Sequence, residues 1–198
     1  MVNTINILGF PHAYELSAPT GSSTVLVFVH GWLLSRHYWQ PLVQLLQSEY
    51  QCLIYDARGF GESQPKIQLD LAAARVASQS VVADNQPEKS RNYSLKAYAE
   101  DLGCLLEKLS INHAWAVGHS LGGSVALWAA ELYPDLIRGV ICVNAGGGIY
   151  LKEEFERFRQ AGQKLVKFRP PWLGYIPLLN LVFARMMVVR PLSLKWGR

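Results

Sequence analysis

The sequence predicts an α/β protein built on a doubly wound, mainly parallel sheet. Four short apolar runs, at 24–29, 51–55, 114–117 and 137–143, have the length and composition of strands buried on both faces. Segments with helical patterns separate these runs, and strands that alternate with helices in this way favour parallel pairing. Polar or glycine-rich residues follow each run, as expected where the carboxyl ends of parallel strands meet at one edge.

The individual elements follow from local patterns in chain order. Gly9 and Pro11 separate two short strands near the N-terminus. Ser94 has the properties of a helix N-cap, and Pro134 ends a later helix that is rich in Ala and Leu. Residues 69–83 are expected to form a small helix or a flap. The full expected order is strands 4–8, 12–16 and 24–29, helix 36–47, strand 51–55, helix 94–109, strand 114–117, helix 124–133 and strand 137–143.

The composition is that of a globular chain. Half of the 198 residues are apolar and 17% are charged, which excludes a disordered chain and allows a sizeable core. We find neither a secretory signal nor an uncharged apolar stretch long enough to span a bilayer, so a cytoplasmic location is expected by default. The three cysteines lie in apolar stretches, and this predicts buried, reduced thiols at Cys52, Cys104 and Cys142.

The charge is unevenly distributed along the chain. Residues 1–149 carry 9 Lys/Arg and 12 Asp/Glu, whereas residues 150–198 carry 10 Lys/Arg and 3 Asp/Glu. This shift predicts a subdomain boundary near Ile149, with residues 1–149 in one unit and residues 150–198 in another. The apolar face of the second unit would line a substrate pocket, lie on a membrane surface or pack on the first unit. Nucleic acid is disfavoured as a partner, because the basic residues alternate with Glu and aliphatic residues.

The most informative stretch is Gly118-His119-Ser120-Leu121-Gly122-Gly123, which joins a buried strand to a helix. A serine between two such glycines at a strand–turn–helix junction is typical of a nucleophile elbow. Side chains at 118 and 122 would collide with the neighbouring backbone, and the strained turn predicts a positive φ at Ser120. The N–H of Leu121 would face the developing negative charge. The alternative is an ordinary glycine-rich turn with a capping serine.

Three blocks of the sequence together resemble the α/β-hydrolase superfamily over residues 4–150. The blocks are His30-Gly31-Trp32, Tyr55-Asp56-Ala57-Arg58-Gly59-Phe60-Gly61-Glu62-Ser63 and the elbow run. The resemblance implies that Ser120 is the nucleophile and that the N–H groups of Trp32 and Leu121 bind the oxyanion. It implies no metal and no cofactor, and a framing role for Asp56 and Arg58 in a turn beside the site. It also implies supporting roles for His30, Gly31, Gly118, His119, Gly122 and Gly123. With this resemblance, residues 1–149 are expected to be the N-terminal part of the hydrolase core and residues 150–198 the start of a helical cap or lid.

The catalytic base is missing from this pattern. A serine hydroxyl needs a base, usually a histidine oriented by a carboxylate, and in this fold both follow the serine. No histidine follows His119, whose side chain we expect to point away from Ser120. Asn144 stands where some members place the acid, but an amide cannot carry that charge. We therefore expect that the sequence is an N-terminal fragment without the last strands of the fold, and that this fragment alone is inactive.

Other histidines are not expected to supply the base. His30 belongs to the loop that carries one oxyanion donor, and His113 enters the elbow strand at the wrong end of the sheet. His12 and His37 are expected at the surface or in packing.

Three functions remain open for this pattern. The first is a serine hydrolase that cleaves an ester or thioester of a small-molecule substrate with an apolar acyl group. The second uses the same elbow for peroxide-dependent acyl transfer, as in cofactor-free haloperoxidases, or for carbon–carbon cleavage, as in the lyase-type hydrolases of menaquinone synthesis. The third is a non-catalytic binding protein, which the retained Gly118 and Gly122 disfavour. A serine instead of an aspartate at the elbow disfavours dehalogenase chemistry by direct alkyl attack.

Overall fold

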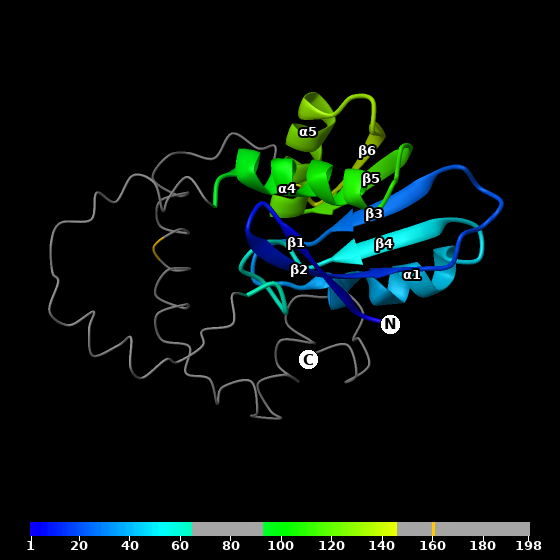
Figure 1. Ribbon diagram of the computed structural model, residues 1–198, viewed down its shortest axis with the longest axis horizontal. Coiled ribbons are helices and arrows are strands. Elements are labelled where there is room, and N and C mark those ends of the chain that lie inside the picture. Colours follow the sequence, from blue (N-terminus) through cyan, green and yellow to red (C-terminus); the bar gives the residue numbers. More distant parts are fainter. Residues whose placement is uncertain (65–92, 146–159, 161–198) are drawn as a thin grey trace, which may run out of the picture. The chain divides into compact units, whose positions relative to one another are not determined.

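A computed structural model describes residues 1–64, 93–145 and 160 of the chain, and its main feature is a six-stranded sheet (Figure 1). The strand order is β1-β2-β4-β3-β5-β6. The described elements are β1 (Asn3–Ile7), β2 (Phe10–Leu16), β3 (Val25–Val29), η1 (Arg36–Trp39), α1 (Gln40–Leu46), β4 (Gln51–Tyr55), α4 (Leu95–Lys108), β5 (Ala114–His119), α5 (Leu121–Leu132) and β6 (Ile137–Val143).

The pairing of the strands confirms the expected fold class. β4, β3, β5 and β6 pair in parallel, and these are the four apolar runs of the sequence. β1 and β2 form an antiparallel hairpin that adds to β4. β5 lies between β3 and β6, so its carboxyl end, where the elbow begins, is in the interior of the sheet.

Helices cover both faces of the sheet, as a doubly wound fold requires. Figure 1 shows α4 and α5 above the sheet and α1 below it. The residues of each strand alternate between the two sides. On the α4 and α5 side, Val27, Leu53 and Ala116 are fully buried, and on the α1 side Phe28 and Ile54 are buried around Trp39. The strands β3 and β4 are therefore buried on both faces of the sheet, as expected for central parallel strands.

Three local features differ from the sequence expectation. The N-terminal hairpin turns at Leu8 and Gly9, with φ of 47° and 87°, and Pro11 lies inside β2. Two positive φ values are the signature of a tight hairpin turn, so the break needs only two residues. The expected helix 36–47 begins as the 3-10 segment η1, and α5 begins at Leu121, three residues earlier than expected, because the elbow leads directly into it.

The expectation that all three cysteines are buried was wrong for Cys142. Cys52 is buried, Cys104 is half-buried and Cys142 is exposed, and all three are free thiols. Cys142 lies in β6, which forms one edge of the described sheet, and its neighbour Ile141 is 43% exposed. The apolar composition of residues 137–143 therefore predicted the strand β6 correctly, but it did not predict that Cys142 in this strand is exposed.

The chain divides into two compact units, Met1–Gly146 and Gly147–Arg198. All the elements above belong to the first unit. The expected flap at 69–83 and the expected cap at 150–198 lie outside the described residues, Gln160 excepted. In the part of the chain that the structure describes, no helix is long and apolar enough to cross a membrane.

Candidate active site

Ser120 occupies the sharp turn between β5 and α5. Its backbone has φ 53° and ψ −118°, a combination that residues with a Cβ rarely adopt, and this confirms the positive φ expected from the motif. The turn is held on both sides, because the Ser120 N–H donates to the Val143 carbonyl (3.1 Å) and the Gly123 N–H donates to the Ser120 carbonyl (3.0 Å). The side chain of Ser120 makes no capping bond to α5.

The glycines around Ser120 are required by close backbone contacts. A Cβ on Gly118 would collide with the backbone of Gly122, and a Cβ on Gly122 would collide with the carbonyl of Val29 in β3. Backbone atoms cannot move aside as the end of a long side chain can. The G-x-S-x-G spacing therefore follows from the packing of the elbow between β5 and the end of β3.

The loop after β3 lies directly against the elbow. A Cβ on Gly31 would be 3.2 Å from the Ser120 Cβ and 2.9 Å from Nδ1 of His119. Gly31 opens a tight turn in which the Leu34 N–H donates to the Gly31 carbonyl (3.2 Å) and Leu33 has φ 60°. The backbone that carries the Trp32 N–H is thus beside the serine, where the sequence placed one of the two oxyanion donors.

His30 fixes the orientation of this loop. Its Nδ1 donates to the Gly31 carbonyl (2.8 Å), and its Nε2 accepts from the Ala57 N–H (3.0 Å). The Gly31 carbonyl therefore has two donors, and since the peptide is trans, the N–H of Trp32 points to the opposite side. Burial lowers the pKa of His30, against smaller opposing effects of the Gly31 carbonyl and Asp56. With both nitrogens occupied, His30 supports the loop and is not available as a base.

His119 packs against the loop with one polar atom unsatisfied. Its ring stacks on Tyr38 with the centroids 4.8 Å apart and the planes tilted by 33°. Within residues 1–64 and 93–145, Nδ1 of His119 is buried and has no hydrogen-bond partner. Burial also lowers the pKa of His119, so that its neutral form is favoured. The ring is directed into the packing between the elbow and the Gly31 loop.

The turn after β4 is framed by a buried carboxylate, as the sequence implied. Asp56 is fully buried, and it accepts the N–H groups of Arg36 (2.7 Å) and Glu62 (2.9 Å) as well as the Arg36 guanidinium. That guanidinium also pairs with Glu15 and Glu62, each at 2.9 Å. Burial acts to lower the pKa of Arg36, but Glu62, Asp56 and Glu15 outweigh it and the pKa is raised. Asp56 is therefore committed to structure.

A second buried cluster, which the sequence did not indicate as a pair, joins this turn to α4. Arg58 donates to both oxygens of Asp101 (2.8 and 2.5 Å) and stacks over the ring of Phe10. His12 is fully buried, with Nε2 3.3 Å from Asp101 and Nδ1 donating to the Phe10 carbonyl (3.1 Å). His12 is thus a packing residue, one of the two roles expected for it. Forty-three positions separate Arg58 from Asp101, so no local pattern could have paired them.

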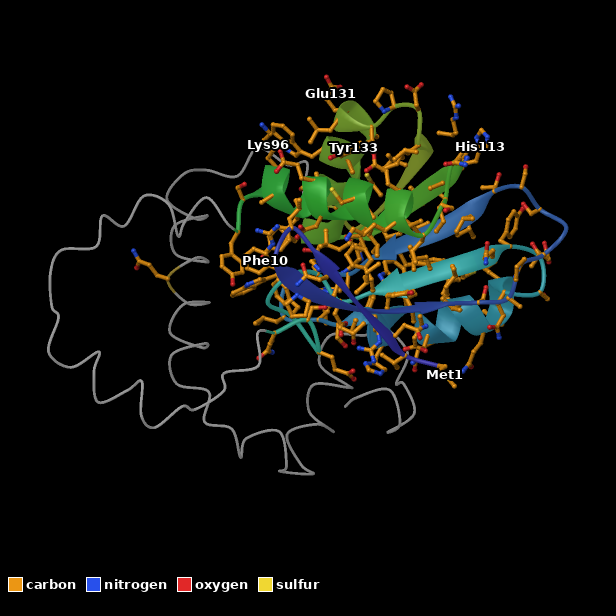
Figure 2. All side chains as sticks on the ribbon, in the orientation of Figure 1. Met1, Phe10, Lys96, His113, Glu131 and Tyr133 are labelled. Atoms are coloured by element: carbon orange, nitrogen blue, oxygen red, sulfur yellow. The ribbon has the colours of Figure 1, made fainter. Side chains whose placement is uncertain are left out.

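The remaining histidines are His113 and His37. His113 precedes β5, and Figure 2 shows it at the end of the sheet opposite to Phe10, which lies near the carboxyl ends of the parallel strands. His37 contacts the hydroxyl of Ser35 (3.3 Å) at the surface. Across residues 1–64 and 93–145, no three His, Cys, Asp or Glu side chains gather as potential metal ligands.

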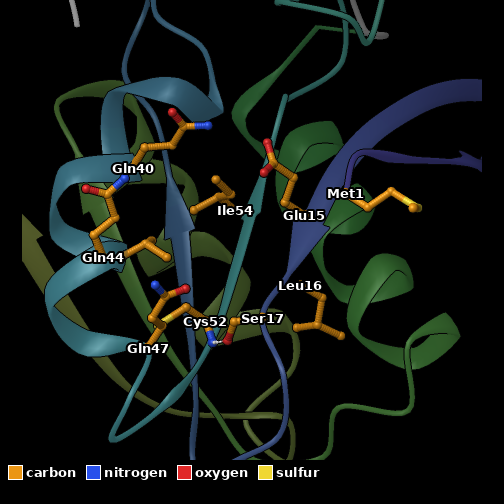
Figure 3. Close-up of a pocket in the computed structure, with 10 residues that line it drawn as sticks. Met1, Glu15, Leu16, Ser17, Gln40, Gln44, Gln47, Cys52 and Ile54 are labelled. Atoms are coloured by element: carbon orange, nitrogen blue, oxygen red, sulfur yellow. Dashed lines mark hydrogen bonds between the residues drawn. The ribbon is translucent and has the colours of Figure 1, made fainter. Parts of the chain in front are cut away.

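A hollow of about 300 Å³ is a different place on the molecule (Figure 3). It lies between α1 and the strands β2 and β4, and glutamines of α1 line one side of it. Cys52 lies at its floor, and burial raises the pKa of this thiol to about 11. None of its lining residues belongs to the elbow or to the Gly31 loop, so the hollow is not a pocket of the Ser120 site.

Comparison with curated proteins finds relatives that are longer than this chain. A 2-(acetamidomethylene)succinate hydrolase of Mesorhizobium japonicum is 30% identical over 124 residues, which is 63% of this chain and 36% of the relative. A putative carbamate hydrolase, RutD, of Enterobacter cloacae is 28% identical over 148 residues, which is 75% of this chain and 47% of the relative. The chain therefore spans less than half the length of these relatives.

Solved structures and a family model agree with the observed fold. A thermophilic esterase from Thermogutta terrifontis superposes with a TM-score of 0.62 at 24% identity, covering 90% of this chain and 58% of the esterase. Cfl2 of Burkholderia cenocepacia superposes with a TM-score of 0.68 at 17% identity, covering 99% and 64% of the two chains. The family model for the alpha/beta hydrolase fold matches residues 24–179, which include the Gly31 loop, the Asp56 turn and the elbow. On this match and this topology, the chain belongs to the α/β-hydrolase fold family.

Proposed function

We propose that this chain carries the nucleophile and the oxyanion hole of a serine hydrolase that cleaves an ester or thioester. The observation that supports this most is the strained backbone of Ser120, with φ 53°, held in contact range of the Gly31 loop. A left-handed backbone at a residue with a side chain costs free energy, and such strain concentrates at functional sites. A serine that served only as a helix cap would not need this backbone.

In the proposed reaction, Oγ of Ser120 attacks the carbonyl carbon of the substrate. The carbon–oxygen double bond becomes a single bond, and its electron pair becomes an oxyanion that accepts the N–H groups of Leu121 and Trp32. The Ser120 hydroxyl gives up its proton to a base in this step. The oxyanion then collapses, the bond from the carbonyl carbon to oxygen or sulfur breaks, and the leaving group takes up a proton and departs as the alcohol or thiol. Water then hydrolyses the acyl group that remains on Ser120. Each oxyanion donor is worth about 2.7–4 kcal/mol of transition-state stabilisation in serine enzymes.

The apolar side chains beside the site support an apolar acyl group on a small-molecule substrate. Trp32 and Leu33 are 37% and 40% exposed, and both follow Gly31 in the loop that lies against Ser120. Large apolar side chains that stay exposed together mark binding surfaces. We keep as further proposals that residues 150–198 begin a cap over such a group and that the protein is cytoplasmic.

The names of the two curated relatives support attack at a carbonyl carbon. One is named for an acetamido compound and the other for a carbamate, and both are called hydrolases. In each of these substrate classes a heteroatom leaves an acyl or carbamoyl carbon, which is also the chemistry of an ester. We therefore propose carbonyl hydrolysis as the reaction type, with the leaving group open to experiment.

We propose that the proton acceptor for Ser120 is not one of the five histidines of this chain. His30 has both nitrogens bonded and His12 lies in the cluster with Asp101. His119 stacks on Tyr38, His37 contacts Ser35 and His113 precedes β5. Loss of a triad partner leaves a residual rate, about 10³–10⁴ over water, from binding and the oxyanion hole. We therefore expect this chain to be acylated slowly by activated esters and to show almost no turnover, because deacylation needs the same base.

The experiment uses p-nitrophenyl butyrate at about pH 9, where hydroxide can replace the missing base and the leaving group needs no proton. The expected result is one slow equivalent of p-nitrophenolate per chain from the wild type and none above the blank from Ser120→Ala. His113→Ala, at the far end of β5, is the control and should behave as the wild type. Equal release by Ser120→Ala would remove the proposal.

A further inference from the structure

We propose that Tyr38 is a positioning residue for the two oxyanion donors, acting through His119. This inference rests on the proposed function of Ser120, and it adds a residue that the motifs do not include. Tyr38 does not touch the reacting atoms in this account. It holds the ring of His119 against Gly31 and so sets the spacing between the loop and the elbow.

A column of four aromatic rings carries this inference. Phe28 and Trp39 have their ring centroids 5.2 Å apart, Trp39 and Tyr38 5.0 Å, and Tyr38 and His119 4.8 Å. Phe28 is fully buried in β3, and Trp39 is 4% exposed. The column therefore begins in the rigid core of the sheet and ends at the residue before the nucleophile.

The column joins the two segments that must keep a fixed separation. Phe28 belongs to β3, whose end leads into the Gly31 loop, Tyr38 belongs to η1, which follows that loop, and His119 ends β5. The rings thus bracket the loop from both of its ends. On the other side of the contact, Gly31 lies so close to Nδ1 of His119 that a Cβ there would be only 2.9 Å away. The His119 ring therefore lies against the Gly31 backbone, and in this proposal a movement of the ring changes the position of the loop.

Two unsatisfied atoms argue that the column is more than ordinary packing. Nδ1 of His119 and Nε1 of Trp39 are both buried and have no hydrogen-bond partner among the residues that the structure describes. Leaving a buried polar atom unpaired is unfavourable, and core packing alone favours apolar side chains at such places. Tyr38 is itself 42% exposed, so burial of apolar area is a weak reason for its stacking. A requirement for the position of the rings accounts for all three features.

The expected effect on the reaction is large relative to the size of the change. A misplacement of about 1 Å in a catalytic group can cost about 100-fold in rate. Removal of the Tyr38 ring frees His119 on one side and lets the Gly31 loop relax. The rate of the acylation step should then fall, while substrate binding, which does not use this contact, should change little.

The test measures acylation of the 198-residue chain by p-nitrophenyl butyrate over a range of concentrations, which separates the limiting rate from the half-saturation concentration. Tyr38→Ala should lower the limiting rate about 10- to 100-fold with little change in half-saturation, and Tyr38→Phe should stay within about 2-fold. Tyr93→Ala, which removes another exposed, stacked tyrosine at 48% exposure, is the matched control and should leave the rate unchanged.

Three results would overturn the positioning role. They are an unchanged limiting rate in Tyr38→Ala, a loss that appears only in half-saturation, and a Tyr38→Phe variant as slow as Tyr38→Ala. A measurement without chemistry separates this inference from the proposed function: the backbone amide resonances of Trp32 and Leu121 should shift in Tyr38→Ala and not in Tyr38→Phe. If they do so while Ser120→Ala reacts as fast as the wild type, the column is supported and the serine hydrolase is not.

Discussion

The strain at Ser120 can be measured as a stability difference between two substitutions. Ser120→Gly should make the chain more stable than Ser120→Ala, although glycine ordinarily costs stability. The side chain of Ser120 makes no capping bond, so neither change removes one. What differs is the backbone: at φ 53° and ψ −118°, alanine keeps the clash of its Cβ, whereas glycine does not have one.

The magnitude follows from two opposing terms. A residue with a Cβ held in a sparsely populated backbone region costs about 1–3 kcal/mol. Against this, glycine lowers the stability by about 0.5–1 kcal/mol, because an unfolded chain with glycine loses more conformational freedom on folding. The net gain of Ser120→Gly over Ser120→Ala is therefore about 1 kcal/mol. With a urea slope of about 2 kcal/mol per M, this moves the unfolding midpoint by about 0.5 M.

The assay is urea unfolding of both variants, followed by tryptophan fluorescence. Ser124 provides the matched control, because it lies inside α5, where glycine is ordinarily less favourable than alanine, and the same pair of substitutions there should have the opposite order. Ser124→Gly should be less stable than Ser124→Ala by about 0.8–1 kcal/mol. If Ser120→Gly is also less stable than Ser120→Ala, the backbone at Ser120 is relaxed and the elbow argument fails.

Three further predictions concern the surroundings of the site. Gly122→Ala should destabilise the chain by about 1–3 kcal/mol and lower the midpoint of urea unfolding, because the new Cβ would collide with the Val29 carbonyl. Gly21→Ala is the control and should leave the midpoint unchanged, because Gly21 has open space around it. Equal midpoints of the two variants would contradict the close packing of Gly122. Under native conditions, iodoacetamide should modify the exposed Cys142 well before the buried Cys52, whose pKa is raised to about 11. Peptide mapping measures the order of modification, and the reverse order would mean that Cys142 in β6 is buried. Because the pKa of His30 is lowered in the folded chain, the unfolded chain takes up a proton on this imidazole at higher pH than the folded chain does. The His30 contribution to the unfolding free energy should therefore be fully present above pH 6.5 and be lost as the pH falls below it. His30→Gln should reduce this pH dependence of the unfolding free energy, and an unchanged pH dependence would contradict a buried, neutral imidazole.

Sequence patterns predicted the parts of this protein that depend on local chemistry. The four apolar runs became the four parallel strands, and the spacing of Gly118 and Gly122 predicted the positive φ of Ser120. Each of these follows from the preferences of residues close together in the chain, which is why a single sequence is enough to find them. The same holds for Ser94, whose hydroxyl accepts the Ala97 N–H and begins α4 as expected.

Features that depend on distant partners could not be found in this way. The buried pair of Arg58 and Asp101 joins a turn to the middle of a helix, and Arg36 meets its carboxylates from two other segments, β2 and the turn after β4. A charged residue in sequence is expected at the surface, and only the fold provides the partners that let it be buried. Cys142 shows the opposite case: an apolar stretch is expected to be buried, but Cys142 is exposed because its strand lies at an edge of the described sheet.

The central claim is that Ser120 is the nucleophile, and locating the acyl group tests it most directly. After reaction with p-nitrophenyl butyrate, proteolysis and tandem mass spectrometry should find the butyryl group on Ser120, in the peptide that contains Gly118 and Gly122. Prior denaturation of the chain should abolish this modification, because the oxyanion donors exist only in the fold. A butyryl group found instead on lysines or on Cys142, with Ser120 unmodified and no difference after denaturation, would contradict the account.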